Sequence, residues 1–311
     1  RSDRDWSSDV CSSDLCMKKK ANEWRVRLME DIKVYENGKF ITLTFSSEAF
    51  KYLSTKVKPC TGYILDNEIA TYAVRRFLER WRRKHKRSVR HWLITELGGK
   101  GTENVHLHGI IYTDDINEVE RIWNNGTIPY GFVWKGKRVK GKIVNYVSDK
   151  TINYIVKYVT KTDQIHKTYK PKVLCSKGIG SSYMKSLAAK KHKFNEAETD
   201  ELYRTSRGMK LALPIYYRNH FFSDEEREKL WLHKLDTNIR WIGGDKVAAD
   251  DEESIRELLI YHQRHNQEMG YGSPASWYTK EYERQRRELM HAKRMELLEQ
   301  KNAKKAEAKC Y

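Results

Sequence analysis

Hydrophobic and polar residues alternate along three stretches of the chain, as they do in half-buried strands. Ile41 and Leu43 fall on one face of the first stretch, and β-branched or aromatic residues are frequent in all three. Strands are therefore predicted at residues 39–46, 91–97 and 104–112. Because Gly98, Gly99 and Gly101 lie between the second and third strands, we expect these two strands to form an antiparallel hairpin.

Apolar residues recur every three or four positions in three further stretches, a spacing typical of helices that pack on a core. The first predicted helix is capped by Asp66 or Asn67, the second by Asp114, and the third, which runs to about residue 162, by Ser148 or Asp149. A strand pair is predicted at residues 130–147. The predicted fold class is therefore α+β, with an antiparallel central sheet, helices packed on it and a helical, basic C-terminal region.

Composition divides the chain into four parts. Residues 1–16 are rich in Ser and Asp and lack any strand or helix period, so we expect a non-native or disordered segment before a start at Met17. The other parts are a mixed domain at 17–170, a basic accessory region at 171–274 and a charged helix at 275–311. Within the accessory region, short helices are predicted near residues 182–191 and 223–235.

The net charge of +18 over 311 residues points to a polyanionic partner, and nucleic acid is the first candidate. Hydrophobic residues make up 39% of the sequence, which excludes a wholly disordered basic tail. No apolar run approaches the ~18 residues that a membrane span needs. The five cysteines form no CxxC pair, which disfavours a zinc finger or disulfide framework and fits a reducing cytoplasm.

A His-Leu-His sequence lies within the third predicted strand. Because side chains alternate along a strand, His106 and His108 share one face, with the leucine on the other. If the hairpin is symmetric about Gly101, Glu96 lies opposite His106 and on the same face as both histidines. Two nitrogens and one oxygen then form a facial set that suits Mg²⁺ or Mn²⁺ and leaves positions open for water and phosphate. An isolated His-x-His pair is more often structural, so the carboxylate is what favours a metal site.

Two overlapping Tyr-x-x-Lys units lie in the third predicted helix. At 100° per residue the apolar residues form one stripe, made by Ile152, Ile155, Val156 and Val159. The opposite stripe consists of Tyr154, Lys157, Tyr158 and Lys161. A tyrosine used for packing would join the apolar stripe, whereas neighbouring ammonium groups favour a phenolate and would hold a phosphate. The alternative is an exposed Tyr/Lys face that only contacts a nucleic-acid backbone.

Together the two groups of residues point to one reaction. A metal polarises a scissile phosphate and a tyrosine attacks phosphorus, so that a 5′-phosphotyrosine forms and a 3′-hydroxyl leaves. Two tyrosines one helical turn apart would allow the second to attack while the first is still esterified.

Three segments resemble, in order, the motifs of HUH endonucleases: the strand FITLTF, HLHG with an upstream Glu, and YIVKYVTK. The doubled Tyr-x-x-Lys is similar to that of the rolling-circle replication initiators of the Microviridae, a family of single-stranded DNA phages. The chain's size and lack of a helicase motif favour the gokushovirus type. The segments CSKGIGSSY and LPIYYR, at residues 175–183 and 213–218, are also similar to that group.

The resemblance implies an initiator that nicks the phage origin, stays on the 5′ end and later rejoins the displaced strand. It implies Glu96, His106 and His108 as ligands of Mg²⁺ or Mn²⁺, Tyr154 and Tyr158 as nucleophiles, and Lys157 and Lys161 as lysines near the phosphate. The expected partners are single-stranded and supercoiled duplex DNA in the cytoplasm of a bacterial host. Because the chain has no GxxxxGK[ST] loop, a host helicase and a host DNA polymerase are expected as well.

A cluster of basic residues ends the first predicted helix and is a candidate surface for DNA. It contains Arg80, Arg82, Arg83, Lys84, Lys86 and Arg87. Trp81 and Trp92 lie close by in the sequence and could stack on bases. The alternative is a solvated helix end with no ligand.

Three other classes of protein remain open from the sequence. A rolling-circle transposase or a conjugative relaxase would cleave DNA in the same way, and a basic DNA-binding protein would not cleave it. A metal-dependent hydrolase that uses the His-x-His pair would leave Tyr154 and Tyr158 without a role.

Overall fold

The computed structural model describes residues 14–98, 103–160, 169–206, 208–236, 239–242, 245–248 and 250–268, together with Glu288, Ala292, Glu299 and Ala303. The predicted N-terminal segment lies outside the described residues except for its last three, and so does the predicted C-terminal helix apart from those four isolated residues. Contacts divide the chain into two compact units. We call them the sheet unit, with the described residues of Tyr35–Tyr158 and Asp163–Lys177, and the second unit, with those of Arg1–Val34 and Gly178–Ser276.

A five-stranded antiparallel sheet organises the sheet unit, in the order β4-β1-β3-β2-β7. The strands are β1 (Gly38–Leu43), β2 (Arg90–Leu97), β3 (Val105–Tyr112), β4 (Val133–Trp134) and β7 (Val173–Cys175). A separate hairpin joins β5 (Lys137–Val139) to β6 (Lys142–Val144). The three predicted strands are therefore present, and the predicted strand pair at 130–147 divides between β4 and this hairpin.

The pairing of β2 with β3 has the register expected from the sequence. Glu96 lies opposite His106, and Ile94 lies opposite His108. Because side chains alternate, Glu96 and both histidines project from the same face of the sheet. The predicted hairpin is confirmed in type and in register, although its tip at residues 99–102 lies outside the described residues.

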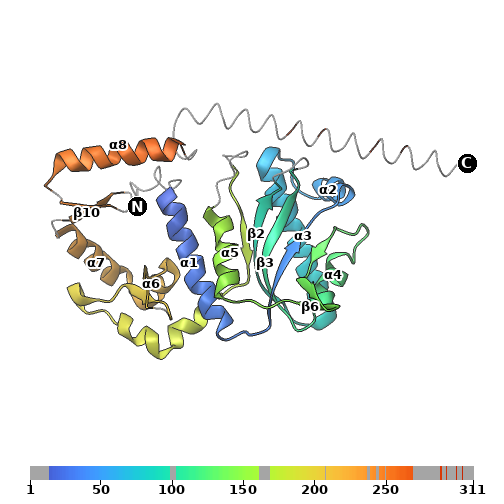
Figure 1. Ribbon diagram of the computed structural model, residues 1–311, viewed down its shortest axis with the longest axis horizontal. Coiled ribbons are helices and arrows are strands. Elements are labelled where there is room, and N and C mark those ends of the chain that lie inside the picture. The colour runs from blue at the N-terminus through green and yellow to red at the C-terminus, as the bar shows by residue number, and fades with distance from the viewer. Residues whose placement is uncertain are drawn as a thin grey trace, which may run out of the picture. The chain divides into compact units, whose positions relative to one another are not determined.

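Three helices bury the opposite face of the sheet: α2 (Ser47–Ser54), α3 (Gly62–His85) and α4 (Ile116–Trp123). Leu43, Leu93 and Leu107 point into this core, where they meet the fully buried Phe77 and Trp123. The fourth helix, α5 (Asp149–Thr160), lies on the other side of the β2–β3 pair from α3 and α4 (Figure 1). Its position brings one face of α5 against the strand face that carries Glu96 and the histidines.

Helix ends differ from the sequence expectation in physically explicable ways. Helix α3 begins at Gly62, one turn before the predicted caps, so Asp66 is fully buried within the helix. Asn67 instead accepts hydrogen bonds from Thr95 Oγ1 at 2.7 Å and Tyr169 Oη at 3.3 Å, linking α3 to the sheet. The cap of α4 is Asp115, whose side chain accepts from the backbone N–H of Asn117 at 2.9 Å.

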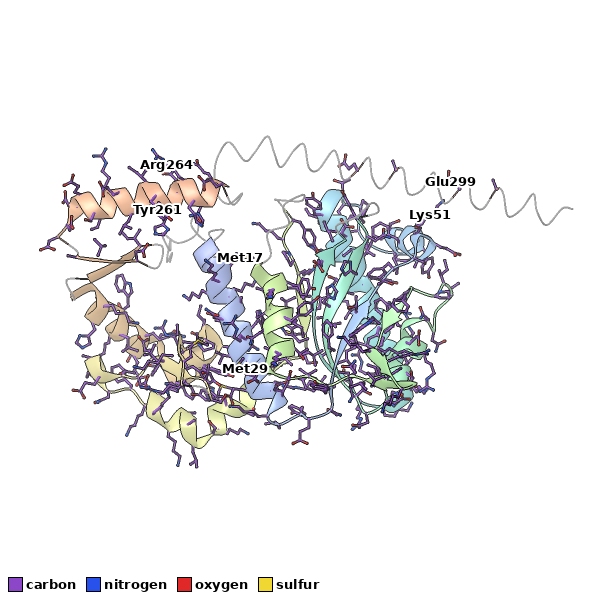
Figure 2. All side chains as sticks on the ribbon, in the orientation of Figure 1. Met17, Met29, Lys51, Tyr261, Arg264 and Glu299 are labelled. Atoms are coloured by element: carbon purple, nitrogen blue, oxygen red, sulfur yellow. The ribbon has the colours of Figure 1, made fainter. Side chains whose placement is uncertain are left out.

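The second unit combines α1 (Asp14–Ile32) with short elements from the later part of the chain. These are η1 (Ser181–Lys185), η2 (Leu187–His192), η3 (Glu196–Glu198), β8 (Leu202–Arg204), β9 (Lys210–Ala212), α6 (Ile215–Phe221), α7 (Asp224–Asp236), β10 (Ile239–Ile242), β11 (Asp245–Ala248) and α8 (Glu252–Glu268). Met17 and Met29 lie near the two ends of α1, and Tyr261 and Arg264 lie on α8 (Figure 2). Its core contains Val26, Tyr183, Tyr203 and Tyr217.

The units do not follow the predicted domain boundaries. Helix α1 clusters with the second unit rather than with the sheet, and β7 continues the sheet beyond residue 170. The helix predicted near 182–191 consists of two 3₁₀ turns, whereas that predicted near 223–235 corresponds to α7. No helix among the described residues is long and apolar enough to cross a membrane.

Gly109, directly after His108, is required where β3 approaches β2. A Cβ at this position would lie 2.1 Å from the carbonyl oxygen of Trp92 and 2.8 Å from Cα of Leu93. We expect Gly109→Ala to force the two strands apart and to lower the free energy of unfolding by about 1–3 kcal/mol. Urea denaturation followed by circular dichroism measures this loss.

Gly126→Ala is the matched control, because its Cβ would meet only the end of the Arg80 side chain, at 3.4 Å. Equal unfolding midpoints for the two variants would contradict the close approach of β2 and β3.

Candidate metal and tyrosine site

Glu96, His106 and His108 meet on the face of the sheet that α5 covers. The Oε2 atom of Glu96 lies 3.1 Å from Nε2 of His106 and 2.7 Å from Nε2 of His108. One donor atom from each of the three residues lies within 4.8 Å of the others. The predicted metal ligands are therefore brought together, and they could hold a metal ion.

Neighbouring oxygen atoms orient both imidazole rings. Nδ1 of His106 lies 3.2 Å from the carbonyl oxygen of Asn104, to which a protonated Nδ1 donates. Nδ1 of His108 lies 2.9 Å from Oγ1 of Thr42, its cross-strand neighbour on β1. With Nδ1 occupied in this way, each ring presents Nε2 to the same point, as metal-binding histidines do.

The spacing of the three donor atoms fits an octahedral ion. Metal–ligand bonds of about 2.1 Å at right angles separate neighbouring donors by roughly 3.0 Å. The separations of 3.1 Å and 2.7 Å between Glu96 Oε2 and the two imidazole nitrogens match that edge length. Three ligands on one side of an ion leave its other positions open to water or to a substrate oxygen.

The two tyrosines of α5 lie next to this triad but differ in their surroundings. The ring of Tyr158 stacks on that of His108, with centroids 4.5 Å apart and planes 11° from parallel. Its hydroxyl donates a 2.6 Å hydrogen bond to the hydroxyl of Tyr154, whose ring is perpendicular to it. Tyr158 is only 9% exposed, whereas Tyr154 is 47% exposed. The site therefore has an inner and an outer tyrosine.

This arrangement corrects the expected stripe of exposed tyrosines and lysines. The apolar stripe of α5 is buried as predicted, but Tyr158 is buried too, because it packs against the metal-site face of the sheet. Burial raises the pKa of Tyr158, and the hydrogen bond to Tyr154 and the charge of Glu96 raise it further. Lys157 is exposed, and Lys161 lies outside the described residues. A phenolate favoured by lysines is thus not what the site without a metal provides.

Sequence reasoning missed the residues that support the site from β1 and the following hairpin. Phe40 lies edge-on to Tyr154 and Trp134, with ring centroids 5.9 Å and 5.4 Å away. Asn145 holds the backbone of Phe40 by accepting from its N–H at 2.9 Å and donating to its carbonyl at 2.6 Å. The available signal was the alternation in FITLTF, which places Phe40 and Thr42 together on the face opposite the core.

The basic end of α3 is built differently from the predicted DNA surface. Trp92 is fully buried and Trp81 nearly so, and neither can therefore stack on a base. Arg80 donates to the carbonyl oxygens of Ile122 at 2.8 Å and Trp123 at 3.2 Å, so it caps the end of α4. Arg82, Arg83, Lys84, Lys86 and Arg87 are exposed.

This basic end is also distant from the metal triad. It precedes the first residue of β2, Arg90, whereas Glu96 is six residues along that strand, roughly 20 Å at 3.3 Å per residue. Helix α3 packs on the opposite face of the sheet. The two predicted functional surfaces are therefore separate.

The sheet unit thus presents an antiparallel α+β fold with a possible metal triad and two adjoining tyrosines. Residues 38–163 match the model of a family of replication-associated proteins, described by its member ORF2. The matched region runs from β1 through α5, so it contains the whole triad and both tyrosines, and it supports a replication-initiator family and DNA binding for this part of the chain. No curated protein and no solved structure matches the chain.

The hydrogen bond between Thr42 and His108 gives a test of the metal site. Removal of a residue that orients a metal-binding histidine typically costs 10–100-fold in metal affinity. We expect Thr42→Val to weaken Mn²⁺ binding by about tenfold, measured by isothermal titration calorimetry, while Thr42→Ser retains most of it. An unchanged affinity in Thr42→Val would show that this hydroxyl does not position the ring.

Proposed function

We propose that this chain is a rolling-circle replication initiator of the HUH endonuclease superfamily, of the type found in the Microviridae. It nicks and rejoins single-stranded DNA at a phage origin through a 5′-phosphotyrosine intermediate. The observation that carries the proposal is the stacking of Tyr158 on His108, which places a pair of tyrosine hydroxyls beside three residues able to hold a metal ion. The match to a replication-associated family over residues 38–163 supports it.

The chain's own residues provide the parts of a phosphoryl transfer. A bound Mg²⁺ or Mn²⁺ would withdraw electron density from the scissile phosphate. A tyrosine oxygen, on Tyr154 or Tyr158, forms a bond to phosphorus and releases its proton as the bond to the 3′ oxygen breaks. That oxygen takes up a proton and leaves as a 3′-hydroxyl. Lys157 and Lys161 would lie near the phosphate and offset its charge.

The pair of tyrosines suits a reaction with two transfers. Tyr154, at the exposed end of the pair, is the more accessible to an incoming strand, and Tyr158 lies one turn further along α5. Once one tyrosine is esterified, the other is within hydrogen-bond distance of it, at 2.6 Å in this structure. The second hydroxyl could then attack the same phosphate region when the displaced strand is complete.

The proposed partners follow from this role. The substrate is the origin in single-stranded or supercoiled duplex form, in the cytoplasm of a bacterial host. A host helicase would open the duplex and a host DNA polymerase would extend the free 3′ end. A relaxase or a rolling-circle transposase would use the same chemistry on other DNA.

The tyrosines provide the decisive experiment. Phe retains the ring that packs on His108 and removes only the nucleophile. We expect Tyr154→Phe and Tyr158→Phe each to form a covalent adduct with single-stranded DNA of the cognate genome in the presence of Mn²⁺, and the double variant to form none. Denaturing gels detect the adduct, and peptide mass analysis identifies the linked residue.

Tyr261→Phe, on exposed α8, is the control for loss of a phenol. If one single variant is inactive and the other normal, only one tyrosine is a nucleophile and the alternating scheme is wrong. An adduct in the double variant would overturn the proposed function.

The metal triad makes a second, independent prediction. EDTA should abolish adduct formation, and His106→Ala should reduce it by at least about 100-fold because a ligand to the Lewis acid is lost. Excess Mn²⁺ should partly rescue Glu96→Ala, in which both imidazoles remain. Full cleavage in EDTA would exclude a metal from the reaction.

A further inference from the structure

A second pocket lies on the other face of the sheet unit, away from the metal triad. It has a volume of about 610 Å³ and lies between α2, α3 and the loop that follows α4. Its wall is formed by Tyr52, Arg76, Arg80, Arg83, Lys84 and Tyr130, with Asn125, Gly126 and Thr127 from the loop. A pocket of this size is within the range of small-molecule sites.

The pocket concentrates positive charge from one face of a single helix. Arg76, Arg80, Arg83 and Lys84 recur at spacings of four, three and one residues, which keeps them on the same side of α3. No carboxylate is among the residues that line the pocket. Four cations therefore surround a space that holds no compensating anion from its own wall.

Existing contacts neutralise only part of this charge. Arg76 pairs with Glu79, and Lys84 pairs with the buried Glu118 at 2.7 Å, both outside the pocket wall. Arg80 donates to backbone carbonyls and lies 4.6 Å from the ring centroid of Tyr130, so its charge meets dipoles rather than a carboxylate. Arg83 is exposed and makes no hydrogen bond or ion pair within the part of the chain that the structure describes.

An aromatic ring at the rim adds a second kind of contact. Tyr52 of α2 is partly exposed at the pocket and has Nζ of Lys56 5.2 Å from its ring centroid. Tyr130 is buried and holds Arg80, so Tyr52 is the ring available to a ligand. An arginine fork binds phosphate oxygens, and a neighbouring aromatic face stacks on a base.

We propose that this pocket binds one phosphate-bearing nucleotide, with the phosphate at Arg83 and Lys84 and the base against Tyr52. The choice of a DNA nucleotide rests on the proposed function. The nucleotide is either part of a DNA strand or free in solution, because both carry the same groups. The pocket opens on the face of the sheet that α3 covers, so a strand held here is a different segment from the one beside the tyrosines.

Arg82 and Arg83 form a matched pair for the test. They are adjacent and both exposed, but Arg82 donates to Ser88 Oγ at 3.3 Å and does not line the pocket. Binding of a labelled single-stranded oligonucleotide is measured by fluorescence anisotropy in EDTA, where no cleavage contributes. We expect Arg83→Ala to lower the slope of log affinity against log salt by about 0.7, and Arg82→Ala to change it little.

That slope change corresponds to a roughly threefold smaller loss of affinity between about 50 and 200 mM salt for Arg83→Ala than for the wild type. Tyr52→Leu should weaken binding of the oligonucleotide without changing the slope, because it removes stacking and no charge. Calorimetry with deoxyadenosine monophosphate separates the two sources of the ligand. Binding that Arg83→Ala abolishes identifies a free nucleotide, and absence of binding beside an effect on the oligonucleotide identifies a strand.

Equal effects of Arg83→Ala and Arg82→Ala on both ligands would overturn the pocket. This result is distinct from failure of the proposed function, which would appear as a missing covalent adduct whatever the binding in EDTA.

Discussion

The pairing of β2 with β3 is the constraint on which the metal triad depends. Side chains alternate along a strand, so a shift of one residue would turn Glu96 into the core and leave both histidines without a carboxylate. The observed register places Glu96 opposite His106, and Gly109 allows the strands to approach where a Cβ would collide with the backbone at Trp92. The glycine of the HLHG sequence thus has a steric role next to the chemical one of the histidines.

The triad alone would be a poor indicator of function, because two histidines and a glutamate can also form a structural ion pair. Helix α5 changes this interpretation. It covers the face that carries the triad and brings a tyrosine ring parallel to His108, with a second hydroxyl 2.6 Å from the first. A simple packing role would not require two phenols that share a hydrogen bond beside three converging donor atoms. For this reason the tyrosines, rather than the triad, discriminate between a strand-transfer enzyme and a protein that merely binds DNA.

The sequence predicted those features that depend on local geometry. The hairpin register needed only a symmetric turn, and the apolar stripe of α5 needed only the helical period. Thr42 could not be assigned because it meets His108 through the pairing of β1 with β3, across 66 residues of chain. The burial of Trp92 and the capping role of Arg80 were missed for the same reason, since both depend on which helix packs on which face. Helix α1 was missed because the adjoining segment has no clear period, and its stability comes from packing in the second unit.

Charge and chemistry occupy opposite faces of the sheet unit. The face with the triad carries a carboxylate, two imidazoles and two phenols, whereas the pocket on the other face is lined by four cations. Exposed cations bind phosphates at long range and lose affinity as salt rises, but a metal site requires a defined geometry and is much less sensitive to screening. An active site crowded with lysines and arginines would hold DNA in many registers, most of them unproductive. Placing a large part of the phosphate affinity away from the tyrosines allows tight binding while the metal ligands alone select the phosphate that reacts.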